Sequence, residues 1–218
     1  MEIKTFIGGF AKAYALVDEK TVLVDCGPRG NRRTMEKALA EIGVRPADVS
    51  LIVITHGHAD HVGPLKHLRE LTGAPALCHE IAAAALEEGW GEPIVPRTRF
   101  ARLVTRLSPG NTERNRRPVE TDIVISGEME LDSYGVSARI IPTSGHTAGS
   151  LTVLTTDGDA LIGDLIMRFG PGKPKLAMLS NDVGRLRASL RALLDAGAER
   201  FHLAHGGLLD RSTVEGLL

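Results

Sequence analysis

Four side chains of the kind that bind metals follow directly after a short apolar run, and this cluster is the feature that most restricts the fold. Residues 50–55 read SLIVIT and predict a buried strand. His56, His58, Asp60 and His61 come next. Because side chains two positions apart in extended chain point to the same side, the first two histidines can reach one metal ion. Asp60 and His61 lie past the turn and face a neighbouring point. A solvated loop that gathers these side chains by coincidence is the alternative.

Short apolar runs alternate with helical patterns through most of the chain. Gly43 and Gly73 end the first two helical patterns, and Pro64 suits the first residue of the second helix. The order of elements leaves little room for a second core, so we expect one α/β domain with two sheets and outer helices. Strands are expected at 21–27, 50–55, 74–80, 121–125, 136–142, 150–155, 159–163 and 200–206, and helices at 34–42, at 64–72, in the alanine-rich stretch that ends at Glu88, and at roughly 182–196.

Three further ligand-type residues stand at the ends of other predicted strands. His146 lies in the loop PTSGHTAGS before a strand, Asp164 follows the run LIG, and His205 ends the last predicted strand. Each has a glycine beside it, which lets backbone approach closely. One strand end cannot complete a metal site, so these residues are the candidates for the missing ligands.

The ordered set of motifs resembles the metallo-β-lactamase-fold hydrolases over nearly the whole chain. The resemblance rests on His-x-His-x-Asp-His at 56–61, Gly-His-Thr at 145–147, Gly-Asp at 163–164 and the late His205. It implies a four-layer αββα sandwich of two mixed sheets flanked by helices, spanning residues 1–218. It also implies that His56, His58 and His146 hold one metal, that Asp60, His61 and His205 hold a second, and that Asp164 bridges them.

The resemblance implies two divalent metal ions, for which Zn²⁺ is our prediction and Fe or Mn the alternatives. Two such ions about 3.5–4 Å apart can bind one hydroxide between them and activate it for attack on a carbonyl or phosphorus. Asp60 would then pass a proton to the leaving group. Asp25, in the stretch VDCG, resembles an early family motif and is a candidate to orient a ligand histidine; a turn-forming aspartate is the alternative.

A basic segment interrupts the pattern at about 90–118, and we interpret it as an Arg-rich helical lid or insertion. Arg97, Arg99 and Arg102 are candidate contacts for an anionic small-molecule substrate, and so are Lys173 and Lys175 in a Gly/Pro loop after Asp164. A solvated helical hairpin and a solvated loop are the alternatives for the two segments. Seven arginines fall between residues 97 and 118, at 97, 99, 102, 106, 114, 116 and 117.

Composition and charge exclude several classes of protein. The net charge of −1 gives no basic field for nucleic acid, and no apolar run approaches the length of about 20 residues that spans a membrane. We expect no signal peptide, since the first 20 residues lack a basic start followed by a long apolar stretch. We expect a cytoplasmic location, since Cys26 and Cys78 show no spacing typical of a disulfide framework or a CxxC motif. The sequence leaves the oligomeric state open, with a homodimer as one possibility.

The range of possible substrates is narrowed by positions at which this sequence differs from known subfamilies of the fold. Asp164 stands where many true β-lactamases carry a metal-binding cysteine, and Ser150 where thioesterases and lactonases of the fold commonly carry histidine. A generic hydrolase of an ester, thioester or lactone remains. One alternative is an oxidoreductase similar to persulfide dioxygenases, with a single iron held by His56, His146 and Asp164. Another is a scaffold that a metal stabilises without catalysis.

Overall fold

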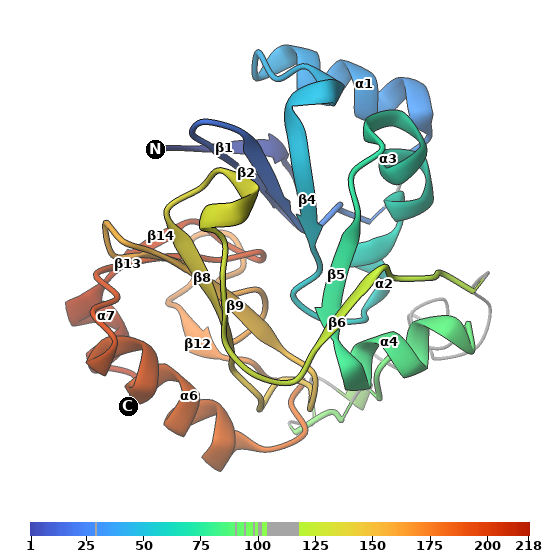
Figure 1. Cartoon of the computed structure of the whole chain (residues 1–218). Helices are drawn as coiled ribbons and strands as arrows, with labels where there is room; N and C mark the ends of the chain where they lie inside the picture. The colour runs from blue at the N-terminus through green and yellow to red at the C-terminus, as the bar shows by residue number, and fades with distance from the viewer. Residues whose placement is uncertain (29, 90, 94, 98, 100–101, 104–117) are drawn as a thin grey trace.

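Two mixed β-sheets form the centre of the molecule (Figure 1). The computed structural model describes residues 1–28, 30–89, 91–93, 95–97, 99, 102–103 and 118–218. The first sheet has the strand order β1-β2-β3-β4-β5-β6; its first three strands are antiparallel, and β3 to β6 are parallel. Its strands are β1 (Glu2–Ile7), β2 (Ala13–Val17), β3 (Thr21–Val24), β4 (Val49–Val53), β5 (Ala76–His79) and β6 (Ile123–Ile125).

The second sheet has the order β14-β13-β10-β9-β8-β7, in which β10 and β13 run parallel and the other neighbours antiparallel. The segment between β10 and β13 contains a separate two-stranded sheet of β11 and β12. The strands are β7 (Met129–Glu130), β8 (Ala138–Pro142), β9 (Leu151–Thr155), β10 (Asp159–Leu161), β11 (Ile166–Met167), β12 (Lys175–Leu176), β13 (Arg200–His202) and β14 (Leu208–Asp210).

Helices cover the outer face of each sheet, which confirms the four-layer αββα prediction (Figure 1). The first sheet is covered by α1, α3 and α4, and the second by α6 and α7. Gly73 ends α3 with a φ of 71°, a left-handed conformation that glycine adopts without strain. The helices are α1 (Arg32–Glu41), α2 (Ala59–Val62), α3 (Leu65–Thr72), α4 (Glu80–Glu87), α6 (Val183–Asp195) and α7 (Arg211–Glu215), with 3₁₀ turns at Pro46–Asp48 and Asp132–Tyr134.

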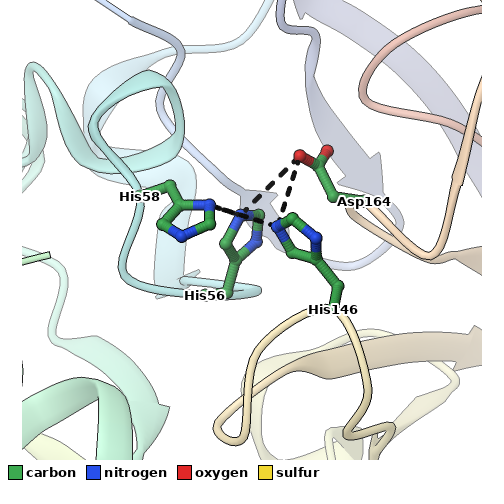
Figure 2. Close-up of side chains that lie close together, drawn as sticks. All are labelled: His56, His58, His146 and Asp164. Carbon is green, nitrogen blue, oxygen red and sulfur yellow. Dashed lines mark hydrogen bonds and ion pairs between the residues drawn. The ribbon is translucent and has the colours of Figure 1, made fainter. Parts of the chain in front are cut away.

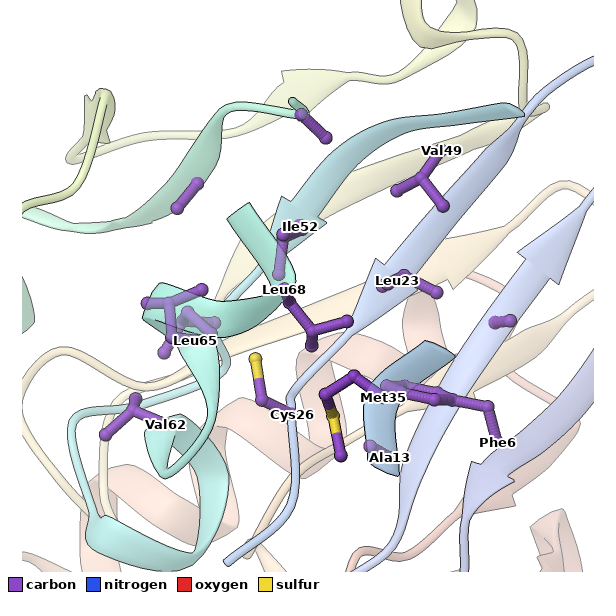
Figure 3. Close-up of a cluster of buried hydrophobic side chains, with 14 of the residues drawn as sticks. Phe6, Ala13, Leu23, Cys26, Met35, Val49, Ile52, Val62, Leu65 and Leu68 are labelled. Carbon is purple, nitrogen blue, oxygen red and sulfur yellow. The ribbon is translucent and has the colours of Figure 1, made fainter. Parts of the chain in front are cut away.

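The apolar runs of the sequence supply three layers of core. Leu51 and Val53 of β4 pack between the two sheets, whereas Ile52 points to the opposite face, towards the helices. Figure 3 shows Ile52 with Leu65 and Leu68 of α3 in that outer core. Because this part of β4 is buried on both faces, residues 51–53 are continuously apolar rather than alternating.

The structure extends the sequence expectations at several points. The hairpin β1–β2 and the final β14–α7 unit were not expected, and Glu80 begins α4 instead of ending a strand. Most of the predicted lid lies outside the described residues, including Trp90, Arg106, Arg114, Arg116 and Arg117. Among the helices of the described ranges, we find none with the length and apolar character needed to cross a membrane.

Candidate metal centre

The strand ends at one edge of the sandwich bring the predicted ligand residues together. His56 and His58 follow β4, and His58 directly precedes α2, which carries Asp60 and His61. The loops that follow β8, β10 and β13 add His146, Asp164 and His205. The carboxyl ends of strands from both sheets meet here, so side chains far apart in sequence become neighbours.

The first group consists of His56, His58, His146 and Asp164, all buried (Figure 2). One nitrogen or carboxylate oxygen of each lies within 4.8 Å of the others. His58 Nδ1 is 3.1 Å from both His56 Nε2 and His146 Nε2. Asp164 Oδ2 is 3.6 Å from His146 Nε2 and 3.9 Å from His56 Nε2. This group has the size and donor types of a metal site.

The second group consists of Asp60, His61 and His205, whose ligand atoms also lie within 4.8 Å of one another. His205 Nε2 is 3.1 Å from Asp60 Oδ2, and His61 Nε2 is 4.0 Å from the same oxygen. Asp164 lies between the groups: its Oδ1 is 3.4 Å from His61 Nε2, and its Oδ2 is 3.4 Å from His205 Nε2. The two groups therefore share one carboxylate.

Each histidine of the centre has its outward nitrogen next to a protein oxygen. His61 Nδ1 donates to Asp25 Oδ2 over 2.7 Å, and His205 Nδ1 donates to the carbonyl of Phe10 over 2.7 Å. In the neutral form of each ring, these contacts place the N–H on the outward nitrogen and leave the lone pair of the other nitrogen facing the centre, the arrangement of metal-binding histidines. The remaining outward partners are Thr55 Oγ1 for His56, the Glu92 carbonyl for His58 and the Leu179 carbonyl for His146.

Asp25 and Thr55 form the support beneath His56 and His61. Asp25 has a φ of 62°, a strained conformation for a residue other than glycine. Its carboxylate accepts hydrogen bonds from the Thr55 backbone N–H at 2.8 Å and from the Thr55 hydroxyl. Asp25 therefore contacts a candidate ligand directly, and its orienting role stays a prediction.

The electrostatics divide the histidines into two kinds in the metal-free protein. Burial, with His146 nearby, lowers the pKa of His58 to about 3, and burial also lowers the pKa of His56 and of His146. Burial opposes protonation of His205 as well, but Asp164 outweighs it and raises the pKa of His205 to about 10. The first kind is neutral at pH 7 without assistance, and the second is held as a cation by the carboxylates around it.

The hydrogen bonding of the seven residues is consistent with a bound metal. Within the described ranges, His61 Nε2 and Asp164 Oδ1 are buried without a hydrogen-bond partner. Such atoms carry a desolvation cost that a shared cation removes. A neutral imidazole and a carboxylate are also the donor types that first-row divalent metals take.

The predicted substrate contacts are exposed side chains. The guanidinium of Arg97 donates to the backbone carbonyls of Ser180 and Asn181. Arg99, Arg102, Lys173 and Lys175 are also exposed. Their roles stay predictions.

Sequence reasoning missed Glu92, a buried carboxylate beside the first group. Its side chain accepts hydrogen bonds from the backbone of two ligand-bearing loops. No spacing pattern marks such a residue, because its partners are backbone N–H groups 35 and 57 positions away.

Comparisons with known proteins agree with the fold. The sequence profile of the Metallo-beta-lactamase superfamily matches residues 7–205. A probable metallo-hydrolase of Methanocaldococcus jannaschii is 28% identical over 94% of this chain and 91% of that protein. The hydroxyacylglutathione hydrolase of Acidiphilium cryptum is 29% identical over 65% of this chain but only 44% of its own length.

Among solved structures, the BLEG-1 B3 metallo-β-lactamase superposes with a TM-score of 0.67, covering 97% of this chain and 95% of that one. At 20% identity this likeness shows the fold alone. The profile match covers most of the sequence, and it includes every residue from His56 to His205 that forms the two groups. The chain belongs to the metallo-β-lactamase superfamily.

Proposed function

We propose that this protein is a hydrolase whose two groups of side chains hold two divalent metal ions, and that it cleaves an ester, thioester or lactone bond in a small molecule. The observation that carries the proposal is the convergence of seven ligand-type side chains around one shared carboxylate. A site built only for stability needs a single closed metal, whereas two adjoining groups are typical of hydrolytic centres.

The proposed ligand assignment follows the two groups. His56, His58 and His146 hold one ion, and Asp60, His61 and His205 hold the other. Asp164 contributes one carboxylate to both, which its position between the groups supports. Zn²⁺ suits a set of imidazoles and carboxylates, and Fe or Mn accept the same donors.

The chemistry that divalent metals supply in such a centre is Lewis acidity and activation of a water molecule as the nucleophile. The protein positions the reacting groups and carries the proton. Asp60 suits the proton transfer because its side chain is 18% exposed, more than that of any other residue of the two groups. Burial opposes ionisation of Asp60, but His61 and the hydrogen bond from His205 lower its pKa to about 2. With this pKa, Asp60 is ionised at pH 7, so it is in the form that accepts a proton before passing it to a leaving group.

A surface pocket of about 310 Å³ adjoins the second group and offers a path for the substrate. It is lined by His205, Arg168 and the exposed rings of Phe10 and Phe169, whose centroids are 6.0 Å apart. The aromatic pair suits an apolar part of a substrate, and the guanidinium suits a carboxylate or another anion. These features support a small, partly anionic substrate.

The similarity to a hydroxyacylglutathione hydrolase supports hydrolysis of an ester-type bond, and that protein is much longer than the matched region. The match to a probable metallo-hydrolase over nearly the full length of both chains supports the same reaction class. The match to the probable metallo-hydrolase covers 94% of this chain, so it supports the centre as a whole rather than a particular substrate.

The first experiment is elemental analysis of protein purified without chelators, followed by assays on ester, thioester and lactone panels. We expect close to two divalent metal ions per chain and hydrolysis of at least one panel member. His58→Ala should lose metal and activity together, whereas His67→Ala, on the exposed face of α3, should keep both. Close to one iron per chain would contradict the two-metal proposal and favour the dioxygenase alternative.

A further inference from the structure

Glu92 is a buried acid at the first group of ligands, although it comes from the segment that the sequence marks as basic. Its exposed fraction is 1%. It follows α4 in the chain, and within the described ranges the neighbouring Gly91 and Pro93 are more exposed. The side chain is therefore turned inward, towards the loops that carry the histidines.

The carboxylate of Glu92 joins two of these loops. Oε2 accepts a hydrogen bond from the backbone N–H of Gly57 at 2.8 Å, and Oε1 accepts one from that of Gly149 at 2.9 Å. Gly57 lies between His56 and His58, and Gly149 lies three residues after His146. One side chain thus fixes the separation of the two loops that carry all three histidines of the first group.

The backbone of Glu92 acts on the same group. Its carbonyl oxygen is 3.2 Å from His58 Nε2, so it accepts the N–H of that ring. This contact leaves His58 Nδ1 as the lone-pair nitrogen, and Nδ1 is the atom that lies 3.1 Å from His56 and His146. Glu92 therefore sets the tautomer and orientation of one ligand while its side chain places the other two.

The glycine at position 149 leaves room for the carboxylate of Glu92. A Cβ at Gly149 would lie 3.0 Å from Glu92 Oε1 and 3.0 Å from the backbone nitrogen of Ala82, contacts tighter than most side-chain carbons make. A Cβ at Gly57 would lie 3.4 Å from Glu92 Cγ, an ordinary contact. A side chain at position 149 would therefore press on the carboxylate, whereas one at position 57 would not.

The carboxylate of Glu92 accepts hydrogen bonds from two backbone N–H groups, which are neutral and do not cancel its charge. A buried carboxylate is costly unless charge nearby balances it. A divalent cation between His56, His58 and His146 supplies that balance, so the acid and the ion stabilise each other.

We propose that Glu92 is the positioning residue of the three-histidine group, which fixes the spacing of its two loops and strengthens its binding of a divalent metal. This inference rests on the proposed function, since it requires a metal at His56, His58 and His146. It gives Glu92 no contact with the substrate.

The test compares Glu92→Gln with Glu88→Gln, a control that makes the same chemical change at an exposed position after α4. The amide keeps one acceptor oxygen, loses the charge and sets an NH₂ group against a backbone N–H. Zn²⁺ affinity is measured by competition with a chromogenic chelator, and visible spectra of the Co²⁺-loaded proteins report ligand geometry. We expect Glu92→Gln to bind the first metal about 10- to 100-fold more weakly, with an altered Co²⁺ spectrum, and Glu88→Gln to match the wild type.

Each outcome decides between the alternatives. A folded Glu92→Gln protein with wild-type Zn²⁺ affinity and spectrum would overturn the inference and leave the proposed function intact. If the wild type binds no metal, the proposed function and this inference fail together. If Glu92→Gln does not fold, Glu92→Asp decides: it keeps the charge but cannot reach both N–H groups, and unchanged affinity would again overturn the positioning role.

Discussion

Two clusters of side chains lie along the parallel strands β10 and β13. One is centred on Asp159 at the start of β10, and the other on Asp164 beyond its end. At the start, Asp159 accepts hydrogen bonds from Arg200 at 2.8 and 2.7 Å and from His202 at 2.8 Å. Beyond the ends, Asp164 is 3.4 Å from His205 and 3.4 Å from His61. Both clusters join an aspartate to histidine, but the distances differ.

The difference separates an ion pair whose members bond directly to one another from a group whose spacing leaves room for a bound ion. The Asp159 cluster closes to hydrogen-bond distances and lies partly in solvent. In the Asp164 cluster, buried atoms without partners stand 3.4 Å apart. Two ligand atoms that each lie about 2.0–2.1 Å from a tetrahedral zinc are about 3.3 Å from one another. The spacing at Asp164 is therefore that of a shared metal rather than of a direct bond.

The largest expected effect comes from exchanging one oxygen for nitrogen in each cluster. Asp164→Asn removes the carboxylate that both groups share, so we expect hydrolysis to fall below about one-hundredth of the wild-type rate and the metal content to fall with it. Asp159→Asn makes the same change at the start of β10, the strand that precedes Asp164, and should keep both. Activity and elemental analysis measured side by side test the comparison. Equal losses in the two variants would show that the clusters do not differ as described.

The second expected effect follows from removing the metal. A ligand present at 100 times its Kd that binds only the folded state stabilises it by about 2.7 kcal/mol. For a chain of this size, that corresponds to a rise in Tm of about 5–10 °C. Thermal unfolding before and after chelation, and after Zn²⁺ is returned, measures the shift. Asp159→Asn should show the full shift and Asp164→Asn little of it; a wild type insensitive to chelation would contradict the two-metal proposal.

The ligand candidates could be chosen from the sequence because each follows a predicted strand. The ordered motifs resemble those of a known family, which implied that His56, Asp164 and His205 lie near one another, and the structure brings them together. The continuous apolar run at β4 likewise predicted a strand buried on both faces, which Leu51 and Ile52 confirm by packing in different cores.

Other features depend on contacts that a single sequence does not display. The carboxylate of Glu92 accepts hydrogen bonds from the backbone of two distant loops, and such bonds leave no pattern in the sequence. Glu92 also stands in a segment rich in arginine, which favoured the interpretation of that segment as basic. The connection between β1 and β2 contains Gly8, Gly9 and Phe10. No sequence pattern near Phe10 indicated that its carbonyl would accept a hydrogen bond from His205. Strand order is set by the packing of whole sheets, which local patterns do not encode.

The third expected effect is a stability maximum of the metal-free protein near pH 6.5. The pKa of His58 is about 3 in the folded state and 6.5 when unfolded, so the unfolded state binds more protons between these values and stability falls as pH falls below 6.5. His205 has a folded pKa of about 10, so its contribution is complete below 6.5 and is lost as pH rises towards 10. We expect Tm to fall by a few degrees on each side.

Bound metal should remove the alkaline decline, because histidine binds a metal only in its neutral form and His205 then carries no extra proton. Tm measured from pH 4 to pH 10 with and without Zn²⁺ checks this. An alkaline decline of equal size in both forms would place His205 outside the metal centre.

The smallest expected effect is the cost of Asp159→Asn to folding. The pair is partly exposed, with 44% of the Arg200 side chain and 14% of the Asp159 side chain accessible, so we expect a loss of about 1 kcal/mol and a fall in Tm of about 2–4 °C. Burial raises the pKa of Asp159, but Arg200 and His202 outweigh it and leave the pKa below 3.8. Its contribution is therefore present above pH 3.8 and is lost as pH falls further. The difference in Tm between wild type and variant should shrink at pH 3 and should not respond to Zn²⁺ at pH 7. A response to Zn²⁺ would join this cluster to the centre at the far ends of its strands, and the contrast between the two aspartates would no longer hold.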